Sequence, residues 1–198
     1  MLRALPHRIL KRVSQHFSSP SELLTSIDLR EGQKVLELGS PVGFFAPAAL
    51  QKVGPNGHVY VAGPNHESLE KLHHLAHQPN LHLVLLSDVL TGQSVPAGQM
   101  DTIILTNLLS KSYHPDNFCL SLGQYMHAAS EIILIDWDAR PTSESSSLQE
   151  RRVSREQAIR LLTDCGYDFV RVLQTPGYHY GLVFSFSGSP GYNSTNAA

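Results

Sequence analysis

Cysteine, long apolar runs and a surplus of one charge are all scarce in this chain. Its 198 residues include two cysteines, Cys119 and Cys165, too few for a disulfide framework and without the paired spacing of a metal site. No window holds the roughly 18 uninterrupted apolar residues of a membrane-spanning helix. Fifteen Lys and Arg against 17 Asp and Glu give a net charge of −2, so we expect no nucleic acid as partner.

The composition is that of one globular domain. Hydrophobic residues make up 41% of the chain and charged residues 16%, which is enough for a sizeable core. We therefore expect a soluble, cytoplasmic protein whose domain covers residues 20–186. The last segment, residues 187–198, is rich in Ser, Gly, Pro and Asn and is interpreted as a disordered tail.

The first 19 residues form a separate basic segment. Arg3, Arg8, Lys11 and Arg12 occur with no acid before Glu22, and apolar residues recur between them at helical spacing. This pattern predicts a basic amphipathic helix over residues 1–19 that docks its apolar stripe onto the domain. Two alternatives stay open, namely contact of residues 1–17 with an anionic membrane or a protein partner, and an organelle address.

The chain is organised around residues 34–45. An apolar run there ends in Glu37 and Gly39, Gly43 follows four residues later, and a helix-permissive apolar segment comes next. That order predicts a strand, a tight turn and a helix, where glycines let a ligand approach the backbone and the helix start offers free N–H groups. Because a buried acid is costly unless it is hydrogen-bonded, Glu37 is expected to bind N–H groups of the turn or a ligand amine.

Strand and helix patterns alternate along the rest of the chain. The expected strands span residues 34–38, 58–62, 81–86, 101–106 and 131–135, and the helices 21–27, 44–53, 67–77, 116–127 and 154–164. Two closing strands, 168–173 and 180–186, are joined by a turn too short for a helix and must be antiparallel. The sequence thus predicts an α/β fold with a doubly wound, Rossmann-like sheet of five parallel strands plus a C-terminal antiparallel hairpin.

Over residues 20–186 this order resembles the class I S-adenosylmethionine-dependent methyltransferases. Glu37-Leu38-Gly39 through Gly43-Phe44-Phe45 resembles the first motif of that family, and Asn107-Leu108-Leu109 resembles the segment after its fourth strand. Ile135-Asp136-Trp137 is similar to strand five of small bacterial members. The resemblance implies S-adenosylmethionine as cofactor and a small-molecule methyl acceptor.

The resemblance also implies a set of cofactor contacts. The first motif supplies the turn, the position after strand three contacts adenine, and the position after strand four lies near the methionine part. A residue just beyond strand two could replace the family's ribose-binding acid. The residues at these places are Glu37, Gly39, Ser40, Gly43, Asn65, Asp88 and Asn107.

Two family positions differ in this chain. The central glycine of the first motif falls on Pro41, whose ring removes an N–H and adds bulk where the cofactor passes. The acid that receives the ribose hydroxyls falls on Gly63. Since a hydrogen bond to a charged group contributes about 1.5–3 kcal/mol, loss of that acid alone would weaken binding roughly 10- to 100-fold.

Three functions therefore compete. The first is a small-molecule methyltransferase, which needs no dedicated acid, base or metal because methyl transfer depends mainly on alignment. The second is a catalytically inactive domain that has lost the cofactor and works as a binding or partner subunit. A dinucleotide-dependent oxidoreductase comes third, because the closing hairpin does not fit it.

Other polar residues allow two interpretations each. His73 and His77 have the spacing of a metal pair on one helix, but a solvated helix face is favoured because no acid joins them. Asp136 and Asp138, at the end of strand five, either face an acceptor or cap the loop. His179 and Tyr180, at the start of the last strand, either line a substrate opening or point their polar tips into water.

Overall fold

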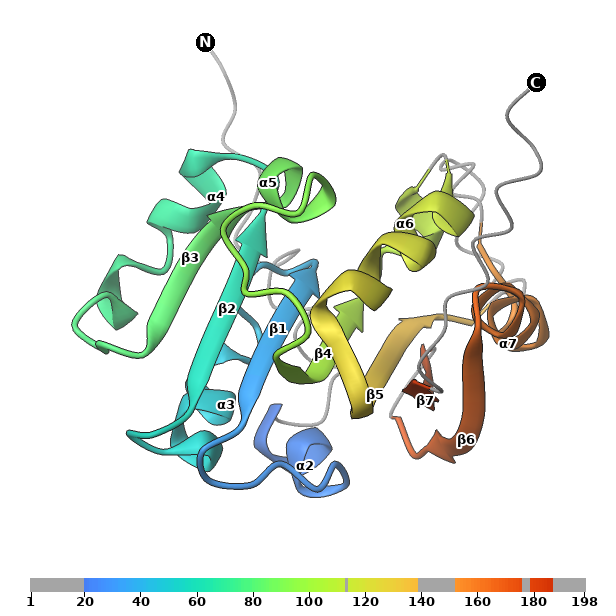
Figure 1. The fold of residues 1–198 in the computed structure, drawn as a ribbon, viewed down its shortest axis with the longest axis horizontal. Coiled ribbons are helices and arrows are strands. Elements are labelled where there is room, and N and C mark those ends of the chain that lie inside the picture. The colour runs from blue at the N-terminus through green and yellow to red at the C-terminus, as the bar shows by residue number, and fades with distance from the viewer. Residues whose placement is uncertain (1–19, 113, 139–151, 176–178, 187–198) are drawn as a thin grey trace, which may run out of the picture.

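A seven-stranded mixed sheet forms the centre of the molecule (Figure 1). The computed structural model describes residues 20–112, 114–138, 152–175 and 179–186, so the expected N-terminal helix (1–19) and tail (187–198) lie outside the described residues. The strands are β1 (Lys34–Gly39), β2 (His58–Gly63), β3 (Leu81–Leu85), β4 (Met100–Thr106), β5 (Met126–Trp137), β6 (Tyr167–Leu173) and β7 (His179–Phe186). Their spatial order is β3-β2-β1-β4-β5-β7-β6.

The pairing confirms the expected doubly wound fold. Strands β3, β2, β1, β4 and β5 are parallel to one another, and β7 pairs antiparallel with both β5 and β6. As a result, the carboxyl ends of β1 to β6 all lie at one edge of the sheet, together with the amino end of β7. Ligands of open α/β sheets bind at this edge.

Helices cover both faces of the sheet. The α-helices are α2 (Pro20–Thr25), α3 (Ala46–Val53), α4 (His66–Glu70), α5 (Leu86–Leu90), α6 (Pro115–Leu122) and α7 (Arg155–Asp164), with 3₁₀ turns η1 (His73–Leu75), η2 (Leu109–Lys111) and η3 (Gly123–Tyr125). One core cluster lies between the sheet and α2 and α3. The other lies between the sheet and α5, α6 and α7. In Figure 1, α3 lies behind the strands and α6 in front of them.

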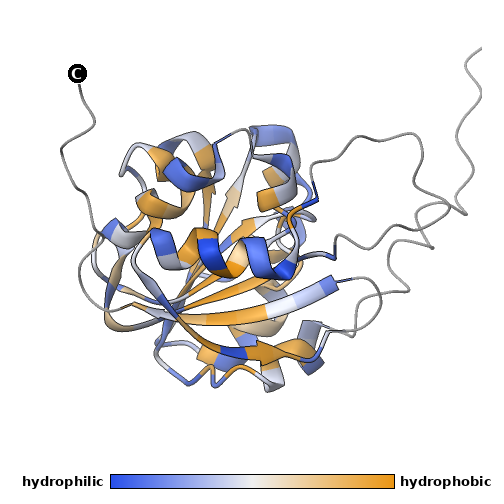
Figure 2. Cartoon of the chain, turned by 90° about the vertical axis from the view of Figure 1, so that its right-hand side faces the viewer, coloured by the Kyte–Doolittle hydropathy of each residue, from blue (hydrophilic) through white to orange (hydrophobic). Residues whose placement is uncertain are grey.

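The strands alternate between these two cores. In β1, Val35 belongs to the core beneath α3, whereas Leu36 and Leu38 belong to the core beneath α6. All three side chains are fully buried, as expected for strands covered on both faces. Figure 2 shows mostly apolar strands, with the hydrophilic residues of the helices largely on their outward sides. None of the described helices is long and apolar enough to span a membrane.

The helix expected over residues 67–77 is replaced by α4 followed by η1. Leu69, Leu72 and Leu75 are spaced by three residues, which matches the three residues per turn of a 3₁₀ helix. The backbone follows that spacing, because the N–H of Leu72 donates to the carbonyl of Leu69 and the N–H of Leu75 to that of Leu72. The short turns keep Leu69 and Leu72 buried on one side.

Two other boundaries differ from the sequence prediction. The helix expected over 116–127 ends at Leu122, and β5 already begins at Met126, which pairs with Met100 of β4. The Ser130 hydroxyl donates to the Met100 carbonyl at 2.6 Å and so holds this extension in the sheet. The short helix α5 was not predicted, since Leu86 was assigned to the preceding strand.

Candidate functional site

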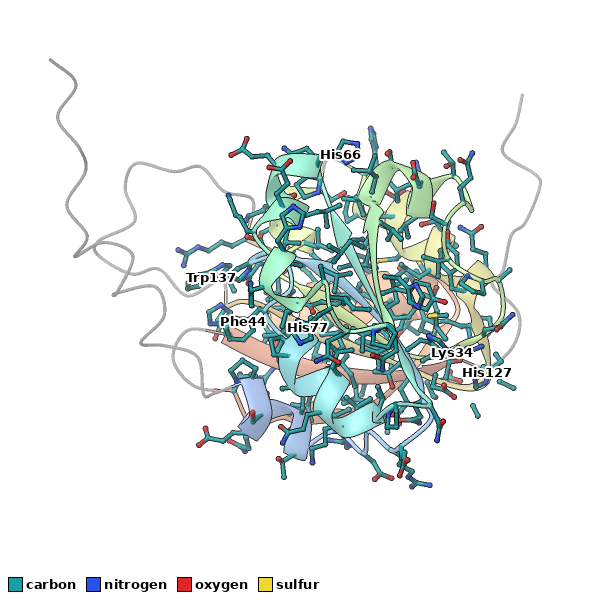
Figure 3. All side chains as sticks on the ribbon, turned by 90° about the vertical axis from the view of Figure 1, so that its left-hand side faces the viewer. Lys34, Phe44, His66, His77, His127 and Trp137 are labelled. Atoms are coloured by element: carbon teal, nitrogen blue, oxygen red, sulfur yellow. The ribbon has the colours of Figure 1, made fainter. Side chains whose placement is uncertain are left out.

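The predicted site residues come from loops at the carboxyl edge of the parallel strands. Glu37, Gly39 and Asn107 lie at or just after the ends of β1 and β4. Figure 3 shows Phe44 and Trp137 on this side of the molecule, and Lys34 and His127, from the amino ends of β1 and β5, on the other. The predicted residues thus lie along one edge of the sheet, although no contact with a ligand is part of the structure.

Glu37 joins β1 to the start of α3. Its side chain is 2% exposed, and Oε1 accepts a hydrogen bond from the backbone N–H of Phe45 at 3.1 Å. Burial raises the pKa of Glu37 to about 7, although the backbone N–H groups of residues 44–46 act in the opposite direction. The second oxygen, Oε2, is buried and has no partner among the described residues. The turn-holding role of this acid is thus confirmed, and the ligand-amine role stays a prediction.

The fold itself requires both glycines of the turn. Gly39 has φ +133°, and a Cβ there would lie 2.0 Å from the carbonyl oxygen of Thr106 in the neighbouring strand β4. Gly43 has φ +71°, and its Cβ would lie 2.5 Å from a methyl group of Leu72. The backbone of Thr106 excludes a larger residue at Gly39, and at Gly43 a larger residue would be strained by the positive φ and would have to displace the side chain of Leu72, before any ligand is considered. The glycines therefore do not by themselves indicate cofactor binding.

Asn107 connects the ends of three strands. Its backbone N–H donates to the carbonyl of Ile135 in β5 at 2.9 Å, and its side-chain Nδ2 donates to the carbonyl of Ser40 at 2.8 Å. The N–H of Ser40 in turn donates to Thr106 at 2.9 Å. Asn107 has φ +51°, and its Oδ1 is buried without a partner in the described part of the chain. The structure thus brings Ser40 and Asn107 together, as the sequence predicts.

Pro41 lies on the exposed part of the same loop. The Ser40–Pro41 peptide bond is cis, and the carbonyl of Pro41 accepts a hydrogen bond from the N–H of Phe44 at 3.3 Å. The proline is exposed, while Gly43 behind it is buried. The ring therefore projects from the turn instead of filling the space between β1 and α3.

Side chains of α4 fill the space beside Gly63, which lies at the end of β2. It is buried, and a Cβ at this position would lie 2.7 Å from Cδ2 of Leu69 and 2.8 Å from Oγ of Ser68. An acidic side chain would therefore have to displace the side chain of Leu69. Asn65, the expected replacement for the acid, is the N-cap of α4, and its Oδ1 accepts from the N–H of Ser68 at 2.9 Å. Its role toward a ribose remains a prediction.

Asp88 lies in the first turn of α5, after β3. Its two carboxylate oxygens accept hydrogen bonds from the hydroxyls of Ser87, at 3.2 Å, and Ser94, at 3.3 Å. Both partners are local and exposed. The acid is therefore near the carboxyl edge but is already engaged with its own loop.

An apolar cavity of about 620 Å³ lies between α5 and α6. Its apolar wall consists of Leu86 and Leu90 of α5, Leu108 beside Asn107, and Phe118 of α6. Lys111 and His114 add polar groups. Sequence reasoning missed this cavity, although the spacing of Leu86 and Leu90, four residues apart, could have indicated a helix that turns an apolar face toward it.

Asp136 caps the loop after β4. It is 1% exposed, its Oδ2 accepts from the N–H of Leu109 at 2.9 Å, and its Oδ1 accepts from the N–H of Trp137 at 2.7 Å and from the hydroxyl of Ser110 at 3.3 Å. Burial raises the pKa of Asp136, against the effect of these hydrogen bonds. Of the two interpretations of this acid, the structure supports the capping role.

The histidines do not form a metal site in the described ranges. His73 and His77 are both exposed, and no group of three His, Cys, Asp or Glu residues is placed to hold an ion within residues 20–112, 114–138, 152–175 and 179–186. His179 instead packs against Trp137, with ring centroids 4.0 Å apart. That contact joins the end of β5 to the start of β7.

Comparison with known sequences gives short matches. No family model matches the chain. A protein-L-isoaspartate O-methyltransferase of Ignicoccus hospitalis is 34% identical over 92 residues, which cover 42% of this chain and 40% of that enzyme. A second enzyme of that name, from Methanothrix thermoacetophila, is 56% identical over 34 residues, covering 17% of this chain and 16% of the enzyme. Each match thus spans less than half of the curated relative.

Solved structures resemble nearly the whole chain. A SAM-dependent methyltransferase from Aquifex aeolicus superposes with a TM-score of 0.75 at 22% identity, covering 91% of this chain and 98% of that one. PigF with SAH gives 0.68 at 15% identity, covering 89% and 56%. An O-methyltransferase family 2 protein from Planctomyces limnophilus, in complex with apigenin, gives 0.69 at 15% identity, covering 90% and 59%. The chain therefore has the fold of the class I S-adenosylmethionine-dependent methyltransferases.

Proposed function

We propose that this protein is an S-adenosylmethionine-dependent methyltransferase that acts on a small molecule. The observation that carries the proposal is the joining of the β1 and β4 loops by Asn107 and Ser40 at the carboxyl edge. Next to this junction lie an unpartnered Oδ1 of Asn107 and a large apolar cavity behind Leu108. The fold relatives include a methyltransferase with SAH and one with apigenin.

The residues present fit most of the cofactor. Buried oxygens without partners among the described residues, Oδ1 of Asn107 and Oε2 of Glu37, are acceptors that suit an amino-acid ammonium group at this loop. The cavity lined by Leu86 and Leu108 offers the apolar surface that a purine ring requires. Gly63 is the position that does not fit, because it supplies no acceptor for the ribose.

The bound cofactor would supply an activated methyl group. The task of the chain is then to hold the two reactants in line and to exclude water, which can account for most of the catalysis of such a transfer. Glu37 fixes the start of α3 against β1, and Asp136 fixes the loop of Leu109 against β5. These two carboxylates hold the loops after β1 and β4 in place at the carboxyl edge, where two ligands can be oriented.

The second candidate is a domain without cofactor that serves as a binding subunit. The differences at Pro41 and Gly63 motivated it, but none of the fold relatives described above favours it. Protein substrates are a further possibility, since the curated relatives are named for protein-L-isoaspartate. Those matches cover too little of the chain to transfer an acceptor, whereas the fold relative in complex with apigenin, which covers 90% of this chain, supports a small molecule.

Calorimetric titration with S-adenosylhomocysteine and S-adenosylmethionine tests the proposal. We expect a dissociation constant in the micromolar range, raised by the missing ribose acid. If neither ligand gives a heat of binding at millimolar concentration, although the protein is folded and unfolds cooperatively, the methyltransferase would be rejected and the binding subunit favoured.

A matched pair of variants tests the ribose position. Leu69→Ala removes two of the three atoms that oppose a side chain at Gly63 and leaves the Ser68 hydroxyl, which can rotate; Gly63→Asp in that background supplies the acid. The double variant should bind S-adenosylhomocysteine roughly tenfold more tightly than Leu69→Ala alone, because a charged hydrogen bond is gained. Equal affinities would show that the ribose does not reach this position.

A further inference from the structure

A second, polar hollow of about 400 Å³ lies at the same edge of the sheet. It is formed where β5 and β6 end, β7 begins and α7 starts. The polar residues that line it, which come from these four places, include Asp138, Arg155, Glu156, Thr175, His179 and Tyr180. It is separate from the apolar cavity between α5 and α6, with which it shares no lining residue.

The hydroxyl of Tyr180 is the unexplained group of this hollow. The side chain is 5% exposed, and its oxygen is buried without a hydrogen-bond partner among the described residues. Tyr167, on the neighbouring strand β6, is equally buried, but its hydroxyl donates to the carbonyl of Cys119 at 2.7 Å. A buried, unpaired hydroxyl destabilises a fold. Because Tyr180 lines the hollow, a ligand that enters it and shifts the neighbouring side chains can supply the missing partner.

Negative charge predominates around this hydroxyl. Asp138 and Glu156 line the hollow together with Arg155, whose Nε lies 3.5 Å from Oε1 of Glu156. Oε2 of Glu156 accepts from the Ser154 hydroxyl at 3.1 Å, and Nη1 of Arg152 lies 3.5 Å from the carbonyl oxygen of Asp138. Asp136 lies behind, because it is the residue of β5 that pairs with Tyr180. Burial and the carboxylates of Asp136, Asp138 and Glu156 all raise the pKa of Tyr180, so its hydroxyl keeps its proton.

The start of α7 does not reverse this preference. Its N-terminal N–H groups would attract an anion, but the capping box of the helix already uses two of the N–H groups at this end. The Ser154 hydroxyl accepts from the N–H of Gln157 at 3.2 Å, and the Gln157 side chain accepts from the N–H of Ser154 at 2.8 Å. The cap thus reduces the number of helix N–H groups left for an anion, while two carboxylates line the hollow.

We propose that this hollow binds the protonated amino group of the methyl acceptor, with Asp138 and Glu156 as its carboxylate partners and the Tyr180 hydroxyl as a third acceptor. That the ligand is a methyl acceptor rests on the proposed function, whereas recognition of an amine does not. The amino group is a handle for orientation, and no bond to it forms or breaks. Asp136 connects the two regions, since it pairs with Tyr180 and holds the loop of Leu109.

Three ligands of one shape test this inference on the full chain: benzylamine, benzyl alcohol and benzoate. Trp137, the single tryptophan, packs on His179 of the hollow and reports binding through its emission, alongside calorimetry. We expect benzylamine to bind at pH 7 about tenfold or more tightly than benzyl alcohol, and benzoate not to bind. The inference would be overturned if benzyl alcohol or benzoate bound as tightly as benzylamine. It would also be overturned if none of the three ligands gave a binding signal at millimolar concentration.

Variants separate recognition from structure. Tyr180→Phe should weaken benzylamine binding about three- to tenfold without lowering the stability of the chain, and Asp138→Asn should weaken it at least as much. Asp168→Asn, on the exposed part of β6 outside the hollow, is the matched control and should change nothing. A hydroxyl with a purely structural role would leave the affinity for benzylamine unchanged in Tyr180→Phe.

Cofactor titration on the same samples distinguishes the two proposals. Binding of S-adenosylhomocysteine without benzylamine refutes the amine hollow and leaves the methyltransferase standing. If the protein binds benzylamine but does not bind S-adenosylhomocysteine, the amine hollow stands and the methyltransferase is refuted.

Discussion

Glu37 should make the stability of this protein depend on pH near neutrality. Burial raises the pKa of this carboxyl from an ordinary 4.5 to about 7 in the folded state. Between these two values the unfolded chain has lost the proton that the folded chain still holds, so the free energy of unfolding falls by about 1.4 kcal/mol per pH unit. The contribution is fully present below pH 4.5 and is lost as the pH rises through 7, a total of about 3 kcal/mol.

Urea unfolding between pH 4.5 and 8 measures this effect in the native chain and in Glu37→Gln. A glutamine can still accept the hydrogen bond of the Phe45 N–H but cannot ionise, so the variant should lack the decline assigned to Glu37. Other carboxyls contribute equally to both proteins and cancel in the difference. Glu67→Gln, an exposed site in α4, is the control and should keep the native slope. Parallel slopes for the native chain and Glu37→Gln would refute the reasoning.

Three further predictions concern single positions. Tyr167→Phe should lower the free energy of unfolding by about 1 kcal/mol, because a buried hydrogen bond is lost. Tyr180→Phe should raise the free energy of unfolding or leave it unchanged, because its hydroxyl has no partner among the described residues. Losses of the same size for both variants in urea titrations would contradict this contrast. Gly39→Ala should cost about 3 kcal/mol or more, since its Cβ meets the Thr106 carbonyl, and a thermal midpoint near that of the native chain would exclude this close approach. Pro41→Gly should leave the dissociation constant of S-adenosylhomocysteine in calorimetry nearly unchanged, because the ring is exposed at the tip of its loop, and clearly tighter binding by the variant would show that the ring obstructs the ligand.

The alternating patterns predicted the fold because the central strands β1, β2, β4 and β5 are covered on both faces. Continuous apolar runs such as residues 103–105 of β4 occur where a parallel strand is buried on both sides, and the short connection at 174–178 allows only an antiparallel return. Element boundaries were less predictable, since they depend on distant partners. The start of β5 at Met126 follows from pairing with Met100 and from the Ser130 hydrogen bond, neither of which is visible in local composition.

The site could be predicted in part. The strand-turn-helix around Glu37 has a local signature, and the structure places the acid against the N–H groups that the sequence indicated. Tyr180 could be named as a candidate, but its unpaired hydroxyl could not, because satisfaction of a buried group depends on every element around it. The cavity between α5 and α6 was missed because it involves segments that are more than twenty residues apart in the chain.

Pro41 and Gly63, the two positions that differ from the family motif, are expected to affect cofactor binding differently. Pro41 is exposed at the tip of its loop, and the glycines on either side are fixed by Thr106 and Leu72, so its ring adds bulk to an otherwise preserved turn. Gly63 is different, because the side chain of Leu69 occupies the space that an acid would need. An acid at this position would therefore require the side chains of Leu69 and Ser68 to move. A weakened hold on a cofactor should therefore lie at its ribose, beside β2, and not at the turn after β1.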